Sequence, residues 1–518
     1  MAQLKHPPVL IISLDAAENT LIQKWMADGS LPNLSALRQR GSFGNLQTSA
    51  DWLVSSPWPD VCTGTGVEEH GFSHYLVWRP DKMVSERPHS DWMPMTPFWR
   101  QLGADGRRVV VVDIPNTYPP EDFNGVEVSA WSTAEVLSSP STNPPELMDW
   151  IREHIGAPPS VGDAHRPATG KELLEIRDRW IQTTERATDL GLALMAKEQP
   201  WDLFFICLTA THHGGHKLWN LTGASEELGA DEEKAVLHAL KDIYIACDAA
   251  VGRLIEQVQD DVAVIVFSPV GMGPNTSRAE LLPEMLRRIL EGTSGAAESG
   301  NGTGLLKRLR KRIPLRWRTW IKSCLPPALQ DRLTLFWRSG RKDWSRTPAF
   351  CLFSDLAGYI RINQRGREKA GIVEPGDEYD RLCSEIAEGL ATFVDGDSGE
   401  PVVRAITEIA ELYQSGRMLH HLPDLIVRWS ARAAAEHRYI TSPRYGSIPW
   451  PTPGLEPSGR SGEHCPDGFI IASGDRFRPG GTIEGANILD LAPTVYSLLN
   501  LPVPPEMRGR PMKNTGRY

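Results

Sequence analysis

The stretch Val9-Leu10-Ile11-Ile12-Ser13-Leu14-Asp15 lies near the beginning of the chain. Its unbroken apolar run is typical of a strand that is covered on both faces in a parallel sheet. Asp15 follows at the carboxyl end of this predicted strand, where open α/β sheets bind their ligands. A simpler alternative is that Asp15 caps a helix that the sequence predicts from Asn19 to Met26.

Similar apolar runs recur along the chain, each after a polar, helix-like segment. They lie at residues 108–113, 201–208 and 262–267. This alternation indicates repeated βα units with right-handed crossovers. We therefore predict an α/β fold with a doubly wound, mostly parallel sheet and helices on both faces.

Further strands are predicted at residues 358–363 and 422–429, and further helices at residues 378–393 and 488–499. We assign residues 1–290 to the first part of the core and residues 347–518 to its remainder, which carries the late histidine loop described below. Residues 291–346 form a predicted insertion between them.

The insertion begins with a Gly/Ser-rich stretch, residues 291–302, which has little to bury and predicts a loop. Residues 305–322 then combine eight basic residues with leucines and tryptophans. One interpretation is an amphipathic helix that makes weak contact with a membrane surface, a partner or an anionic substrate. The other is a solvated helix packed through its apolar side, which Pro314, Pro326 and Pro327 favour because they cut the periodicity short.

Composition excludes several classes of function. The formal net charge of −10 over 518 residues disfavours a nucleic acid polymer as partner but is compatible with a small phosphorylated ligand. The seven cysteines form no C-x-x-C pair and their number is odd, which disfavours a disulfide framework and favours a reducing compartment. No signal peptide or transmembrane run of about 20 apolar residues is evident, so we expect a cytoplasmic protein. The sequence does not indicate an oligomeric state.

Histidines set far apart suggest a metal site. They occur in Thr211-His212-His213-Gly214-Gly215-His216 and, about 250 residues later, in Ser461-Gly462-Glu463-His464. His212 and His216 have a spacing that lets two imidazoles converge on one ion, and His464 offers a third nitrogen from a distant loop. Three neutral imidazoles with one open position form a competent zinc site. The alternative is that they are ordinary buried or surface histidines, and His213 is given no ligand role.

Several short motifs carry a resemblance to a known family. They are, in order, Leu14-Asp15-Ala16-Ala17, Leu31-Pro32-Asn33-Leu34, Thr63-Gly64 followed by His70-Gly71, Gly271-Met272-Gly273, and Asp490-Leu491-Ala492-Pro493-Thr494. This order resembles the alkaline phosphatase superfamily, and within it the type I phosphodiesterase/nucleotide pyrophosphatase branch. The resemblance implies the alkaline phosphatase type of fold, two metal ions that are usually zinc, and phosphoryl transfer to a serine or threonine before water releases the group.

The resemblance assigns His212, His216 and His464 to one metal site and Asp15 to the other. The second site also needs a consecutive Asp-His pair, but that pair falls on Pro269-Val270, which cannot bind a metal. We therefore expect one zinc ion, with the second doubtful.

The resemblance also implies a nucleophile about nine residues before Thr63-Gly64. Strict spacing places it on Val54, and a slip of one residue would bring Ser55 into position, with Ser56 next. The neighbouring prolines allow a plain turn as the alternative. The segment from Asp113 to Pro120 resembles a family segment near the pocket, so Asn116 and Tyr118 are candidate substrate contacts, although turn structure would explain the same residues.

Two classes of function follow. The first is a metal-dependent hydrolase or transferase that acts on a small phosphodiester, pyrophosphate or related ester through the three-histidine zinc site, with Asp15 as a general base or a weaker metal ligand and Ser55 as the nucleophile. The second is a catalytically degenerate binding or structural protein of the same fold that keeps zinc for stability or ligand capture. Changed chemistry, such as cleavage of a sulfated substrate or group transfer, is a further alternative because fold does not fix chemistry.

Overall fold

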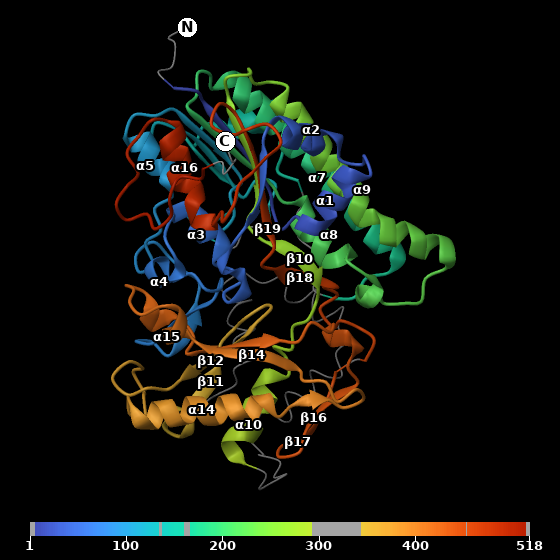
Figure 1. Ribbon diagram of the computed structural model, residues 1–518, viewed down its shortest axis with the longest axis vertical. Coiled ribbons are helices and arrows are strands. Elements are labelled where there is room, and N and C mark those ends of the chain that lie inside the picture. Colours follow the sequence, from blue (N-terminus) through green and yellow to red (C-terminus); the bar gives the residue numbers. More distant parts are fainter. Residues whose placement is uncertain (1–5, 134–136, 160–165, 293–342, 452, 514–518) are drawn as a thin grey trace.

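The computed structural model describes residues 6–133, 137–159, 166–292, 343–451 and 453–513 (Figure 1). Its main lobe is built on a nine-stranded sheet of order β20-β2-β19-β9-β1-β8-β5-β6-β7. In chain order these strands are β1 (Val9–Leu14), β2 (Ser42–Leu46), β5 (Val109–Val112), β6 (Gly125–Ser129), β7 (Ser141–Asn143), β8 (Leu203–Leu208), β9 (Ala263–Ser268), β19 (Gly468–Ser473) and β20 (Gly481–Thr482).

The sheet is mostly parallel, as predicted. Its centre, β1, pairs in parallel with both β8 and β9, and β5 continues the parallel order from β8 to β6. Strands β19 and β7 run antiparallel to their neighbours. The four predicted apolar runs are therefore confirmed as β1, β5, β8 and β9, and their continuous hydrophobicity follows from burial on both faces.

Helices cover both faces of the sheet, and alternate residues of β1 show the two layers. Leu10 and Ile12 pack into one core with α1 (Asn19–Ala27), α2 (Pro32–Arg40), α6 (Leu147–His154), α7 (Gly170–Lys197), α8 (Ala210–Leu218) and α9 (Ala230–Ile255). Val9 and Ile11 pack into the other with α3 (Pro57–Thr63), α5 (Phe98–Ala104) and α16 (Leu491–Leu498). Figure 1 shows these two groups on opposite sides of the sheet.

A second lobe lies below the main sheet in Figure 1 and has its own hydrophobic core. Its four-stranded antiparallel sheet has the order β11-β12-β15-β14. Its elements are α10 (Leu282–Glu291), β11 (Ala349–Cys351), β12 (Gly358–Ile362), α14 (Asp377–Ala391), β13 (Val394–Asp395), β14 (Val403–Glu408), α15 (Ile409–Leu412), β15 (Leu425–Trp429), β16 (Tyr439–Ser442) and β17 (Gly446–Pro449). The predicted strands at 358–363 and 422–429 thus exist as β12 and β15, but they pair with each other and not with the main sheet.

Residues 347–518 are therefore divided between the two lobes. The chain from β11 to β17 builds the second lobe, whereas β19, β20 and α16 complete the main one. Short elements fill the region between them: α4 (Val67–His70), β3 (Val77–Arg79), β4 (Val84–Glu86), β10 (Gly271–Pro274) and β18 (Gly462–Cys465). The antiparallel pair β10 and β18 is labelled between the lobes in Figure 1.

The Gly/Ser-rich stretch and the basic segment 305–322 lie outside the described residues, so their contact with a membrane surface or partner stays a prediction. Within the described ranges no helix combines the length and the apolar character that crossing a membrane requires.

Candidate metal centre

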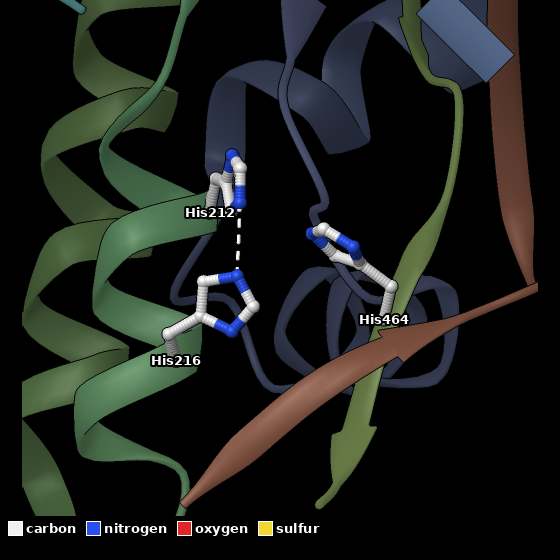
Figure 2. Close-up of side chains that lie close together, drawn as sticks. All are labelled: His212, His216 and His464. Atoms are coloured by element: carbon white, nitrogen blue, oxygen red, sulfur yellow. Dashed lines mark hydrogen bonds between the residues drawn. The ribbon is translucent and has the colours of Figure 1, made fainter. Parts of the chain in front are cut away.

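The structure brings together the three histidines that the sequence separates by about 250 residues. His212 and His216 project from successive turns of α8, and His464 projects toward them from β18 (Figure 2). One ring nitrogen from each residue lies within 4.8 Å of the other two. In the described part of the chain this trio is the one group of three His, Cys, Asp or Glu side chains that can converge on an ion.

Close backbone packing fixes the position of β18 against α8. A Cβ atom built at Gly462 would lie 2.2 Å from the carbonyl oxygen of Gly215 on α8. Strand β10 pairs with β18 in antiparallel register, with Met272 opposite His464. Glycine at position 462 thus allows β18 to approach the helix closely, and this approach carries His464 to the other two rings.

Hydrogen bonds from the far side of two rings direct their free nitrogens toward one another. His212 Nδ1 lies 2.7 Å from Asp15 Oδ2, and His216 Nδ1 lies 2.9 Å from the carbonyl oxygen of Gly462. Both acceptors lack hydrogens, so each Nδ1 carries the proton and each Nε2 keeps its lone pair. This is the arrangement by which proteins fix the tautomer of metal-binding histidines.

The facing nitrogens fit a shared cation. The Nε2 atoms of His212 and His216 are 2.9 Å apart, and both ring nitrogens of His464 are buried without a hydrogen-bond partner in the described structure. Burial, followed by the electrostatic effects of the neighbouring His212 and Arg460, lowers the pKa of His464 to about 3, and burial also holds the pKa of His216 well below its usual range. Neutral imidazoles whose ring nitrogens face one another fit zinc, which prefers nitrogen and sulfur ligands.

Asp15 lies at the end of β1, as predicted, but it contacts the site through His212. Its other oxygen, Oδ1, accepts a hydrogen bond of 2.9 Å from the Trp58 indole. Burial alone would raise the pKa of Asp15, but His212 and the Trp58 hydrogen bond lower it overall, so the carboxylate is charged. Asp15 therefore orients His212, which makes it a positioning residue for the trio.

The positions that would hold the family's second metal ion are apolar. Val270 packs with Ala16, Ala50 and Met272 in a small hydrophobic cluster. The nearby Ser268 hydroxyl donates to the Val270 carbonyl oxygen and accepts from the Ala17 amide, so it is fully engaged. The described residues at this position supply no ligand set for a second ion.

The two serine candidates for the nucleophile differ in accessibility. Ser56 is buried and donates to Asp60 Oδ1 at 2.8 Å. The same carboxylate accepts from Ser49 and pairs with His70, so Asp60 anchors the loop that leads into α3. Ser55 is half-buried in that loop, three residues before Trp58, and its hydroxyl is the more accessible of the two.

The predicted substrate contacts lie in different surroundings. Tyr118 is buried in a cluster with Phe72 and Met93, and its hydroxyl donates to the Met93 carbonyl oxygen at 2.6 Å. Asn116 is half-buried and adopts a positive φ of 57°. The Tyr118 hydroxyl is thus bound within its own cluster, and Asn116 adopts the left-handed backbone conformation that asparagine tolerates in turns. His213, which was given no ligand role, stacks on Trp180 with ring centroids 4.0 Å apart.

Sequence reasoning missed three charged residues around the trio. Arg460 contacts the His216 ring, Glu463 precedes His464, and Asp355 enters from the second lobe. Burial raises the pKa of Glu463, whereas the ion pair with His74, at 3.7 Å, overcomes burial and lowers the pKa of Asp355. Arg460 lies four residues before His464, and this proximity was the one sequence signal for its role. Arginine is not a metal ligand, so a search for metal-binding residues does not find it.

A cavity of about 710 Å³ opens elsewhere and is lined by Arg79, Trp92, Arg367 and His421 among others. Its arginines are paired with acids: Arg79 with Asp81 and Glu86, Arg365 with Glu374, and Arg367 with Asp424. We place the candidate site at the histidine trio and not at this cavity. Buried ring nitrogens without hydrogen-bond partners indicate a missing ligand, whereas the arginines of the cavity already have acidic partners.

Comparisons with known proteins identify the family of the chain. The profile of the type I phosphodiesterase/nucleotide pyrophosphatase family matches residues 9–433. Phosphonoacetate hydrolase from Sinorhizobium meliloti, solved with phosphonoformate, is similar in structure with a TM-score of 0.52 and 12% identity over 95% of each chain. Murine ectonucleotide pyrophosphatase/phosphodiesterase 5 has a TM-score of 0.45 and 13% identity over 96% of each chain.

No curated protein matches the sequence. The similarity to phosphonoacetate hydrolase shows the alkaline phosphatase type of α/β fold that the sequence predicts. The family match covers most of the chain, including β1, α8 and the Pro269-Val270 positions. The chain therefore belongs to the type I phosphodiesterase/nucleotide pyrophosphatase family, whose members are phosphoester hydrolases.

Proposed function

We propose that this protein hydrolyses a small phosphodiester, pyrophosphate or related ester with a single zinc ion held by His212, His216 and His464. The observation that supports this most strongly is the pair of buried, unpartnered nitrogens on His464, which face two further lone pairs on α8. Zinc bound there supplies a Lewis acid that polarises a phosphoryl oxygen.

Neighbouring groups fix the tautomers of two of these three histidines. Asp15 fixes the tautomer of His212, and Trp58 fixes Asp15. The carbonyl oxygen of Gly462 fixes the tautomer of His216. Such partners of metal-binding histidines commonly account for about 10-fold to 100-fold in metal affinity or activity.

Ser55 is our candidate for the nucleophile. Its loop is held in place by Asp60, which binds Ser49, Ser56 and His70, and Ser55 is half-buried in this loop. A separate observation concerns localisation. The buried residues Cys207, Cys247 and Cys383 are free thiols, which supports location in a reducing compartment such as the cytoplasm.

A screen of chromogenic esters tests the proposal. Zinc-loaded protein is assayed with bis-p-nitrophenyl phosphate, p-nitrophenyl phosphate and p-nitrophenyl sulfate, in parallel with the variants His216→Ala and Ser55→Ala. The exposed His238 on α9 provides the control variant His238→Ala. We expect turnover of a phosphate ester that His216→Ala abolishes and His238→Ala preserves. Turnover that survives His216→Ala unchanged would refute the zinc mechanism.

The apolar cluster at Val270 favours a second candidate function, a zinc-binding protein of this fold without turnover. That protein would bind zinc and a small phosphorylated or sulfated ligand, yet release no p-nitrophenol from any of the three esters. The variant Ser55→Ala tests the nucleophile. Loss of turnover in this variant would support a covalent phosphoserine, which mass spectrometry of the quenched reaction of the unchanged protein detects as an added phosphate.

A further inference from the structure

We propose that Arg460 binds the phosphoryl oxygens of the substrate and supplies part of the positive charge that a second metal ion would otherwise provide. The proposal rests on the proposed function of the histidine trio and concerns an arginine that lies against it. Three observations support it: the position of the guanidinium, the partners of its N–H donors, and the lack of charged ligands at the position of the second metal ion.

Arg460 is held at the edge of the trio. Its side chain is 19% exposed, and its carbonyl oxygen accepts a hydrogen bond of 2.9 Å from Asn275. The backbone amide of Arg460 donates to Ser458 Oγ at 3.2 Å. Atom Nη2 lies 3.2 Å from His216 Nδ1 and closer still to His216 Nε2, the nitrogen that carries the free lone pair.

Asp355 and Glu463 form ion pairs with this guanidinium, but neither carboxylate accepts a hydrogen bond from it. Asp355 Oδ1 lies 3.9 Å from Nη1, and Glu463 Oε1 lies 3.6 Å from Nη2, both beyond hydrogen-bond distance. In the described structure the hydrogen bonds of the Arg460 side chain go to His216 alone. Most of its five N–H donors are therefore available to a ligand.

Two buried arginines elsewhere in the molecule show what a structural role looks like. Arg361 donates to Glu368 at 2.8 Å and to two backbone carbonyl oxygens. Arg278 donates to His437, the Ser430 hydroxyl and three backbone carbonyl oxygens. Arg460 is less buried than these two residues, and it lacks their set of acceptors. The missing acceptors match the oxygens of a phosphoryl group, which arginine binds through two parallel hydrogen bonds.

The negative charge of the reacting phosphoryl group explains why the site would need this guanidinium. Phosphoryl transfer spreads negative charge over the equatorial oxygens, and enzymes stabilise it with fixed positive groups. Here Val270 and its apolar neighbours replace the ligands of a second ion. A guanidinium beside the one remaining metal site provides a second positive group at that place.

Contact with His216 also couples Arg460 to the metal. Without metal, Arg460 donates to the Nε2 lone pair that a zinc ion needs. Zinc and the guanidinium therefore compete for one nitrogen, and an anion that binds both would relieve the competition. Removing the guanidinium should weaken binding of an anion but leave zinc affinity unchanged or higher, a result that a merely structural arginine would not produce.

Calorimetric titration of inorganic phosphate into zinc-loaded protein tests this role, with zinc content measured on the same samples. The variants are Arg460→Met and Arg460→Lys, and the control is Arg381→Met at an exposed position on α14. We expect Arg460→Met to keep its zinc and to bind phosphate about 10-fold to 100-fold more weakly, because a hydrogen-bonded charge pair is lost. Arg460→Lys should recover part of the loss, and Arg381→Met should bind as the unchanged protein does.

Two results would overturn the proposal. One is equal phosphate affinity in Arg460→Met and the unchanged protein. The other is loss of zinc in Arg460→Met, which would make Arg460 a support of the histidine site. The proposed hydrolase fails by a different result, the absence of ester turnover, and phosphate binding that depends on Arg460 would then support anion capture without catalysis.

Discussion

Glu456 gives a residue-scale prediction about the dependence of stability on pH. It lies in the loop that precedes Arg460, where burial raises its pKa from 4.5 to about 7. Between these two values the folded protein holds a proton that the unfolded chain has released. The free energy of unfolding should therefore fall as pH rises from 4.5 to 7, by up to about 3 kcal/mol from this group.

The substitution Glu456→Gln should remove this contribution, because the amide stays neutral at every pH. Chemical denaturation of metal-free protein at pH 5 and pH 8 measures it, as the difference between the variant and the unchanged protein at each pH. We expect the variant to gain stability relative to the unchanged protein at pH 8. An equal difference at both pH values would show that Glu456 is charged in the folded protein.

Asp60 carries a second residue-scale prediction. This buried carboxylate binds Ser49, Ser56 and His70, and so holds the loop that contains Ser55. Asp60→Ala should lower the free energy of unfolding by about 2–4 kcal/mol, because the buried Ser56 and His70 and the half-buried Ser49 lose their partner. The exposed Asp149, in Asp149→Ala, is the matched control with an effect below about 0.5 kcal/mol. Equal effects of the two substitutions would mean that Asp60 does not anchor the loop.

At the scale of elements, the close approach of β18 to α8 determines whether the trio forms. In Gly462→Ala the new methyl group would lie 2.2 Å from the Gly215 carbonyl oxygen and 2.9 Å from Trp219 Cβ. Strand β18 must then move away from α8 and take His464 with it. We expect zinc affinity to fall by about 10-fold or more.

Gly273→Ala, on the paired strand β10, is the control for this substitution. Its added Cβ would meet only Cys465 Cβ, at 4.0 Å. Competition with a chromogenic chelator measures zinc affinity for both variants. If Gly462→Ala and Gly273→Ala bound zinc equally well, the spacing between β18 and α8 would not control the site.

The same elements show what the sequence could and could not reveal. Strands β1, β5, β8 and β9 were predictable because burial on both faces leaves a continuous apolar signature. Strands β12 and β15 were predicted as strands, but apolar alternation does not tell which partner a strand will pair with, and their separate sheet was missed. His212 and His216 were predictable from helical spacing, whereas Arg460 and Asp355 reach the trio through tertiary packing that leaves no local pattern.

At the scale of the whole molecule, the trio connects distant parts of the chain. His212 and His216 follow a central strand of the main sheet, while His464 comes from the region between the two lobes. An ion that binds these residues only in the folded protein stabilises it by linkage, by about 2.7 kcal/mol when its concentration is 100 times its Kd. Chelation of zinc should therefore lower the Tm, and the same treatment of His216→Ala should not change it. Equal shifts in both proteins would place the bound metal elsewhere.

Zinc content per chain, measured on protein purified without chelators, tests the central claim most directly. The comparison includes the unchanged protein, His216→Ala and the exposed control His238→Ala. The account predicts one zinc ion per chain in the unchanged protein and in His238→Ala, and none in His216→Ala. Absence of metal from the unchanged protein, or full retention of zinc in His216→Ala, would contradict a three-histidine zinc centre.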